Sequence, residues 1–204
     1  MTSFSIRVYR PTGAATREPV LVPASLDVRP QNWAAVAKGG CWDADIAITG
    51  PLDELAGLTA WLGFQLEIVN DRGTAVWWGD IQTVEITANG VRKGISLDRL
   101  ANRVQLRYSQ KQPGGGVESV DTAWTDNLLS QAAYGVWERR ITPERDMTTN
   151  EATALQATAL NTLSEPHYTL APDPGAPAAR LTCTGYWQRN KREYHYEARG
   201  LVEH

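Results

Sequence analysis

The chain has 204 residues, of which 42% are hydrophobic and 21% charged, and its formal net charge is −3. This length and apolar content can fill a hydrophobic core without disulfides or a structural metal. The negative net charge disfavours binding to polyanions, so we expect no sequence-specific nucleic-acid binding. The chain has no apolar run of the roughly 18 residues that a membrane helix needs, and no basic start followed by an apolar stretch, so neither a membrane segment nor Sec export is expected.

The first 50 residues predict two strands separated by irregular chain. Apolar and polar side chains alternate over residues 4–9 and again over residues 41–49, as they do in strands with one buried face. Four prolines and a Lys-Gly-Gly sequence lie between these segments. They predict loops with at most a short edge strand around residues 20–22.

A short helix and an antiparallel β-meander are expected next. A proline suits the first turn of a helix over residues 52–62, whose leucines share one stripe. Residues 63–108 then alternate through successive strands. Turns are predicted at residues 70–73 and at Asn89 and Gly90, because a two-residue hairpin turn needs residues that tolerate positive φ.

Residues 111–116 contain one proline and three consecutive glycines, a composition typical of flexible linkers. We therefore expect an N-terminal β-barrel-like domain over residues 1–110, the Gly-rich linker, and a C-terminal α+β domain over residues 117–204. The fold class predicted is α+β and rich in β, with two small barrel-like or sandwich-like domains that each pack one helix.

Helices and strands alternate in the second half. Thr148 and Glu151 have the spacing of a capping box, which predicts a helix ending near Leu163. Its expected buried stripe contains Leu155, Ala159 and Leu163. The remaining elements predicted are strands at residues 117–124 and 136–141, a helix at 126–134, a strand at 167–170, and a terminal hairpin with arms at 180–188 and 193–198.

The sequence carries no recognisable catalytic or metal-binding spacing. The three histidines form no pair at helical metal spacing. The glycine run precedes no Lys-Ser or Lys-Thr pair, so no phosphate-binding loop is expected. Cys41 and Cys183 fit buried thiols, and whether they pair stays open. We expect no enzyme activity, cofactor or metal, although carboxylates from distant strands, as in a glycoside hydrolase, stay an alternative.

Tryptophan is the unusual residue here, with 8 copies against 2 phenylalanines. Indoles suit half-buried sheet surfaces and subunit contacts. Alternating strands rich in such residues favour surfaces buried by neighbouring copies. The alternative is a carbohydrate-binding β-module, in which exposed aromatic rings stack on sugars. The candidate contact residues, chosen by type, are Trp77, Trp78, Arg103, Tyr108, Trp137, Arg189, Lys191 and Arg192.

The order of these features resembles the tail-tip and baseplate hub proteins of tailed bacteriophages, of the siphophage type. The resemblance covers residues 41–198. The features that carry it are the strand at 41–49, the helix after it, Val76-Trp77-Trp78-Gly79-Asp80-Ile81, Ser96-Leu97-Asp98, the helix at 150–163 and Gly185-Tyr186-Trp187.

The resemblance implies a structural protein that forms a ring around the tail channel and connects the tail tube to distal tip proteins. Its partners would be copies of itself, with a trimer favoured and a hexamer as the alternative, and other phage tail proteins. It would be made in the cytoplasm of the bacterial host and reside in the virion. Large hubs carry a lysozyme or peptidase module, which this chain lacks, so a minimal hub or an adaptor ring is implied.

Overall fold

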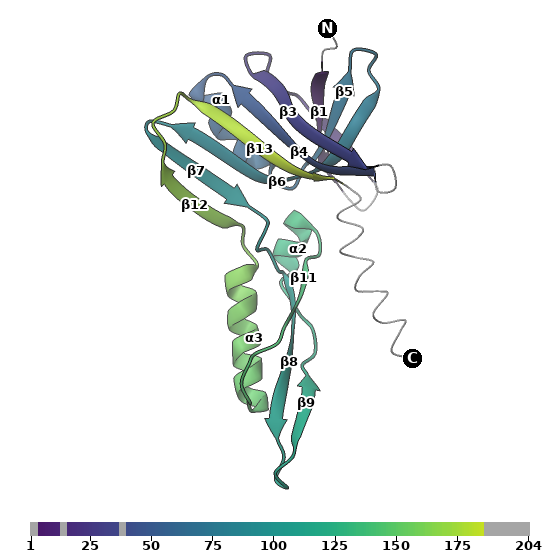
Figure 1. Ribbon diagram of the computed structural model, residues 1–204, viewed down its shortest axis with the longest axis vertical. Helices are drawn as coiled ribbons and strands as arrows, with labels where there is room; N and C mark the ends of the chain where they lie inside the picture. Colours follow the sequence, from purple (N-terminus) through teal and green to yellow (C-terminus); the bar gives the residue numbers. More distant parts are fainter. Residues whose placement is uncertain (1–3, 13–15, 37–39, 186–204) are drawn as a thin grey trace. The chain divides into compact units, whose positions relative to one another are not determined.

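The computed structural model describes residues 4–12, 16–36 and 40–185. Its contacts divide the chain into two compact units (Figure 1): unit 1 is Met1–Leu97 with Tyr168–His204, and unit 2 is Asp98–His167. Each unit is described by itself. The structure is rich in antiparallel strands and has few helices, as the α+β prediction requires.

Unit 1 is built on a nine-stranded sheet. The strand order is β2-β1-β5-β6-β13-β4-β3, with β7 paired to β6 and β12 paired to β7. The strands are β1 (Phe4–Pro11), β2 (Arg17–Val20), β3 (Asp27–Val36), β4 (Gly40–Thr49), β5 (Gln65–Asn70), β6 (Ala75–Ala88), β7 (Val91–Ser96), β12 (His167–Pro172) and β13 (Ala178–Gly185).

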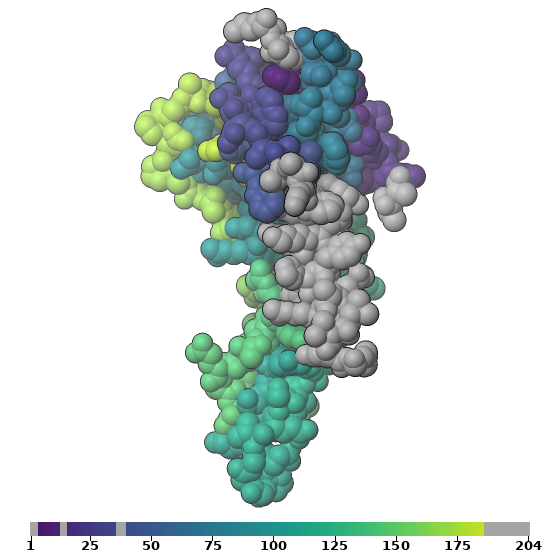
Figure 2. Space-filling view, turned by 45° about the vertical axis from the view of Figure 1, so that its right-hand side comes forward, coloured from purple at the N-terminus to yellow at the C-terminus, as the bar shows by residue number. Residues whose placement is uncertain are grey.

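The sheet of unit 1 curls but does not close into a barrel. The rings of Phe4 on β1 and Trp33 on β3 meet edge to face at 4.7 Å, and Figure 2 shows the dark purple start of β1 beside the violet surface of β3. Among the described residues, no hydrogen-bonded ladder joins these two strands. The expected barrel is therefore corrected to a curled open sheet, because no ladder closes it among the described residues.

The concave interior of unit 1 is apolar. Ile46, Leu66, Ile81 and Leu181 come from four different strands, and all are fully buried. Leu55 of helix α1 (Leu52–Gly57) and Leu58 of the 3-10 helix η1 (Leu58–Trp61) are buried as well. The predicted short helix is thus confirmed, with a tighter second half, and Leu55, Leu58 and Leu62 pack into the core of unit 1, whereas Leu52 is exposed.

Strand β3 of unit 1 differs from its prediction, whereas the turn between β6 and β7 matches its prediction. The prolines and the Lys-Gly-Gly sequence of residues 11–40 predict mostly irregular chain, but β3 is a ten-residue strand at the edge of the sheet. An edge position tolerates a residue without an N–H, and the ladder to β4 shifts register between Pro30 and Asn32. The predicted hairpin turn between β6 and β7 is confirmed, with φ of 53° at Asn89 and 81° at Gly90.

Unit 2 is a small sheet covered by a helix. Strand β8 (Arg103–Lys111) pairs antiparallel with β9 (Val117–Asp121) and β10 (Thr125–Asp126), and parallel with β11 (Glu138–Ile141). Helix α2 (Leu128–Tyr134) leads into β11, and α3 (Thr149–Leu163) packs on the sheet. The core of unit 2 consists of Ala101, Val104, Leu106, Tyr108, Met147, Ala152 and Leu160.

The capping box of α3 is confirmed. The Thr148 side chain accepts a hydrogen bond from the Glu151 backbone, and the Glu151 carboxylate accepts one from the Thr148 backbone. The hydrogen bond from the Thr148 backbone N–H, together with one from the Thr148 hydroxyl, holds the pKa of the Glu151 carboxyl below its ordinary value. The fully buried residues of the helix are Ala152, Gln156 and Leu160. The predicted stripe of Leu155, Ala159 and Leu163 lies beside them, partly buried against the same core.

The division of the chain differs from the predicted one. Residues 111–116 form the turn of the β8–β9 hairpin inside unit 2, where the Gln112 N–H donates to the Gly116 carbonyl at 2.8 Å. They are therefore not a linker between domains. The chain passes between units after Leu97 and after His167, because β12 and β13 return to the first sheet instead of completing a second domain.

Both cysteines are free and buried in unit 1. Burial raises the pKa of the Cys183 thiol far above its ordinary value, and the negative charges of Asp45 and Asp80 add to the rise. The thiolate is the reactive form of cysteine. Cys183 should therefore be inert in the folded protein.

We expect neither cysteine to react with the thiol reagent DTNB at pH 8 in native buffer. Both should react in guanidinium chloride, since unfolding exposes them to water. The measurement is the absorbance of the released thionitrobenzoate. Rapid release of one equivalent from the native protein would contradict this packing.

Candidate functional site

The outer face of β5 and β6 carries a shallow pocket of about 200 Å³, here called the Trp78 pocket. In the antiparallel ladder Gln65 lies opposite Asp80, and Glu67 lies opposite Trp78. Because strand residues alternate between faces, these four side chains project from one face of the sheet. The full lining is Arg17, Gln65, Leu66, Glu67, Trp78, Gly79 and Asp80.

The Glu67 carboxylate is held in place by residues of β1 and β2. The Tyr9 hydroxyl donates a hydrogen bond to it at 3.1 Å, and Arg17 Nη1 lies 2.9 Å from its other oxygen. The Arg17 guanidinium also lies over the Tyr9 ring, 4.0 Å from the ring centre. Glu67 and Asp80 are both buried against the sheet, so this wall of the pocket carries two carboxylates, of which the Glu67 carboxylate is held by these contacts.

The two adjacent tryptophans have opposite environments. Trp77 is fully buried in the core of unit 1, whereas Trp78 is 48% exposed at the pocket. The Trp78 backbone N–H donates to the Cys41 sulfur at 3.3 Å, which fixes the strand beneath the exposed indole. The outer wall of the pocket is therefore an aromatic ring on a rigid strand.

A second, larger depression of about 510 Å³ crosses β4, β13 and β6. Arg180 lies 3.0 Å from Asp45 there, and Asp45 also accepts a hydrogen bond from the Thr182 hydroxyl. The bond to Asp45 raises the pKa of Arg180. The Asp45 carboxylate is thus already paired with the Arg180 guanidinium. Within the described residues, no three His, Cys, Asp or Glu side chains are grouped to hold a metal.

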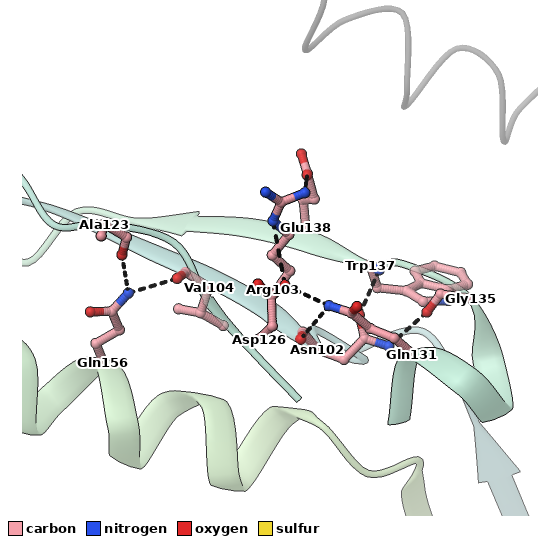
Figure 3. A network of polar contacts seen from close by, with 10 residues as sticks. All are labelled: Asn102, Arg103, Val104, Ala123, Asp126, Gln131, Gly135, Trp137, Glu138 and Gln156. Carbon is pink, nitrogen blue, oxygen red and sulfur yellow. Dashed lines mark hydrogen bonds and ion pairs between the residues drawn. The ribbon is translucent and has the colours of Figure 1, made fainter. Parts of the chain in front are cut away.

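Unit 2 contains a buried polar network centred on Asn102 (Figure 3). Its side-chain amide donates to the Gly135 carbonyl at 2.7 Å and to the Ser130 hydroxyl at 3.2 Å. Its side-chain oxygen accepts from the Trp137 N–H at 2.7 Å. The backbone oxygen of Asn102 accepts from Gln131 at 3.1 Å. One fully buried residue therefore joins the start of β8 to α2 and β11.

Two further polar side chains complete this network in unit 2. Gln156 of α3 donates to the carbonyl oxygens of Val104 and Ala123, at 2.7 Å each, and so fastens the helix to the sheet. Arg103 lies on the opposite face, 3.0 Å from Glu138 and 3.4 Å from Asp126. Arg103 Nε is the exception, since it is buried and has no hydrogen-bond partner among the described residues at its 3.4 Å distance from Asp126. The other groups named here are hydrogen-bonded to one another, so the network stabilises unit 2.

An apolar surface lies on α2. Leu128 and Leu129 are 72% and 86% exposed, and Ala132, Ala133 and Val136 nearby are exposed as well. Surface helices of globular proteins normally turn such side chains inward. Here the inward side of the helix is polar, with Ser130 buried. This cluster of exposed residues is called the α2 surface below.

The predicted contact residues fall into different places. Trp77 and Tyr108 are buried in the cores of their units, so their side chains do not offer a surface to another molecule. Trp78 is exposed at its pocket, Arg103 is held by carboxylates, and the Trp137 indole donates to the Tyr134 carbonyl at 2.8 Å. Arg189, Lys191 and Arg192 lie outside the described residues.

Sequence reasoning missed Glu67 and Asp80 of the pocket and the leucines of the α2 surface. The N-cap residue Asn127 marked the start of the helix, but no local pattern showed that Leu128 and Leu129 would face outward. The pocket could have been found by counting strand partners outward from the 70–73 turn, although a register shift follows Ile68.

No family model, curated protein or solved structure matches this chain. None of the helices in the described residues has the length and apolar character needed to cross a membrane.

Proposed function

We propose that this chain is a structural subunit of a phage tail tip, a minimal baseplate hub or adaptor ring whose copies close around the tail channel. The observation that carries the proposal is the α2 surface, where Leu128 and Leu129 project into solvent. The sequence resemblance supplies the biological setting, and the α2 surface supplies a physical reason for assembly.

A cluster of exposed leucines raises the free energy of the isolated chain in water, because apolar surface is more stable when buried. Burying one such side chain is worth about 1.5–3 kcal/mol, so a contact that covers both leucines supplies a useful part of a subunit interface. Contiguous exposed apolar patches are typical of interaction sites. Repetition of one contact by a closed rotation generates a ring.

In this proposal the partners are copies of the chain itself, as a trimer or a hexamer, together with neighbouring tail proteins. The curled sheet of unit 1 would line the ring, and the protein would reside in the virion. No catalytic step is assigned to it.

Electron microscopy of the negatively stained recombinant chain tests the proposal. Class averages should show closed rings with threefold or sixfold symmetry. Rings should be absent from a Leu128→Ser, Leu129→Ser double variant, since its α2 surface no longer gains free energy from contact with another copy of the chain. A field of particles no larger than the 22.5 kDa chain would overturn the proposal.

A further inference from the structure

We propose that the Trp78 pocket binds a neutral sugar ring. The inference depends on unit 1 alone and does not require ring assembly.

The aromatic wall of the pocket is the Trp78 indole. Trp78 is exposed, and its cross-strand partner is the charged Glu67 rather than an apolar side chain. On β5, the residue opposite the broad indole is therefore charged. A pyranose ring presents a face of C–H groups that can stack on such a surface, with hydroxyls around its edge. Small-molecule sites combine an apolar surface with a few placed polar groups in this way.

The polar wall supplies both donors and acceptors. A carboxylate offers about four lone-pair sites, and the hydrogen bond from Tyr9 and the ion pair with Arg17 occupy two of those on Glu67. Arg17 carries further N–H donors beyond the one directed at Glu67, and Gln65 offers an N–H₂ group and an oxygen. A hydroxyl group both donates and accepts hydrogen bonds, so a ligand rich in hydroxyls can pair with both the donors and the acceptors of this wall.

The charge of the lining selects against acidic ligands. Glu67 and Asp80 contribute two negative charges and Arg17 one positive charge, a formal balance of −1. Phosphate or a uronic acid would meet two carboxylates in a partly desolvated wall, where like charges repel strongly. The pocket, at about 200 Å³, has room for a single ring rather than a long chain.

Saturation-transfer NMR and calorimetry with defined probes test the proposal. The probes are the methyl glycosides of glucose, galactose and N-acetylglucosamine, with glucuronic acid as the acidic contrast and choline as the cationic contrast. The variants are Trp78→Ala and Glu67→Gln. Trp42→Ala is the matched control, because Trp42 is 36% exposed and does not line the pocket. Circular dichroism verifies that each protein is folded.

We expect saturable binding of at least one neutral glycoside by the full chain. Trp78→Ala should weaken it about tenfold, since an aromatic contact is worth roughly one decade in Kd. Glu67→Gln should weaken it at least about tenfold through loss of a charged acceptor, and Trp42→Ala should leave it unchanged.

Three results would overturn the proposal: no neutral glycoside binds at millimolar concentration, glucuronic acid or choline binds more tightly, or Trp78→Ala binds like the unmodified chain. A Trp78→Ala protein that loses oligomeric mass and keeps its sugar affinity would assign Trp78 to a subunit contact, and would overturn the proposal equally.

Discussion

Replacing Asn102 by alanine is expected to unfold unit 2 while unit 1 stays folded. The substitution removes two amide donors and one acceptor from a fully buried position and leaves the Gly135 carbonyl and the Trp137 N–H without their partners. Each buried group left unsatisfied costs about 1–3 kcal/mol. A loss of about 3–5 kcal/mol in the free energy of unfolding is therefore expected, which is large for a unit of this size.

Hydrogen exchange read by mass spectrometry measures this effect. Amides of β8, β11 and α3 should lose protection in Asn102→Ala, whereas those of β4, β6 and β13 should keep it. Asn161→Ala is the control, because Asn161 is exposed on α3 and alanine favours a helix. Equal loss of protection in both units would mean that the two cores do not unfold separately.

Replacing Gly185 by alanine is expected to destabilise unit 1. At this position β13 approaches β4 so closely that an added methyl group would overlap the carbonyl group of Cys41, which is backbone and cannot rotate away. The two strands must separate or the ladder must shift. We expect a loss of about 3 kcal/mol in the free energy of unfolding.

Denaturation by urea, followed by circular dichroism, gives the size of the effect. Gly57→Ala is the matched control, since a methyl group there meets no atom within 4 Å and φ is −64°. Alanine at such a site is neutral or stabilising, by up to about 1 kcal/mol. A Gly185→Ala protein as stable as Gly57→Ala would contradict the close approach of β13 and β4.

Local signals in the sequence predicted several elements well. The alternation of residues 41–49, the Asn89-Gly90 turn and the Thr148 capping box depend on neighbours in the chain, and the structure confirms all three. Alternation also placed Trp77 and Trp78 on opposite faces. It could not show which face was inside, because that depends on how the sheet curls.

Features set by distant parts of the chain were not predicted. β13 inserts between β6 and β4, and nothing within residues 178–185 specifies those partners. The glycines at 114–116 have the composition of a linker, yet the antiparallel pairing of β8 with β9 makes them a hairpin turn. The Glu67 and Asp80 wall likewise depends on the register between two strands. The resemblance to phage tail proteins stays a prediction.

Light scattering coupled to size-exclusion chromatography measures the mass of the particle in solution and so shows whether copies of the chain assemble. We expect a trimer or hexamer of the 22.5 kDa chain. We also expect a folded monomer for the Leu128→Ser, Leu129→Ser variant. A monomeric mass for the unmodified chain at high concentration would contradict the claim that the α2 surface joins copies of this protein.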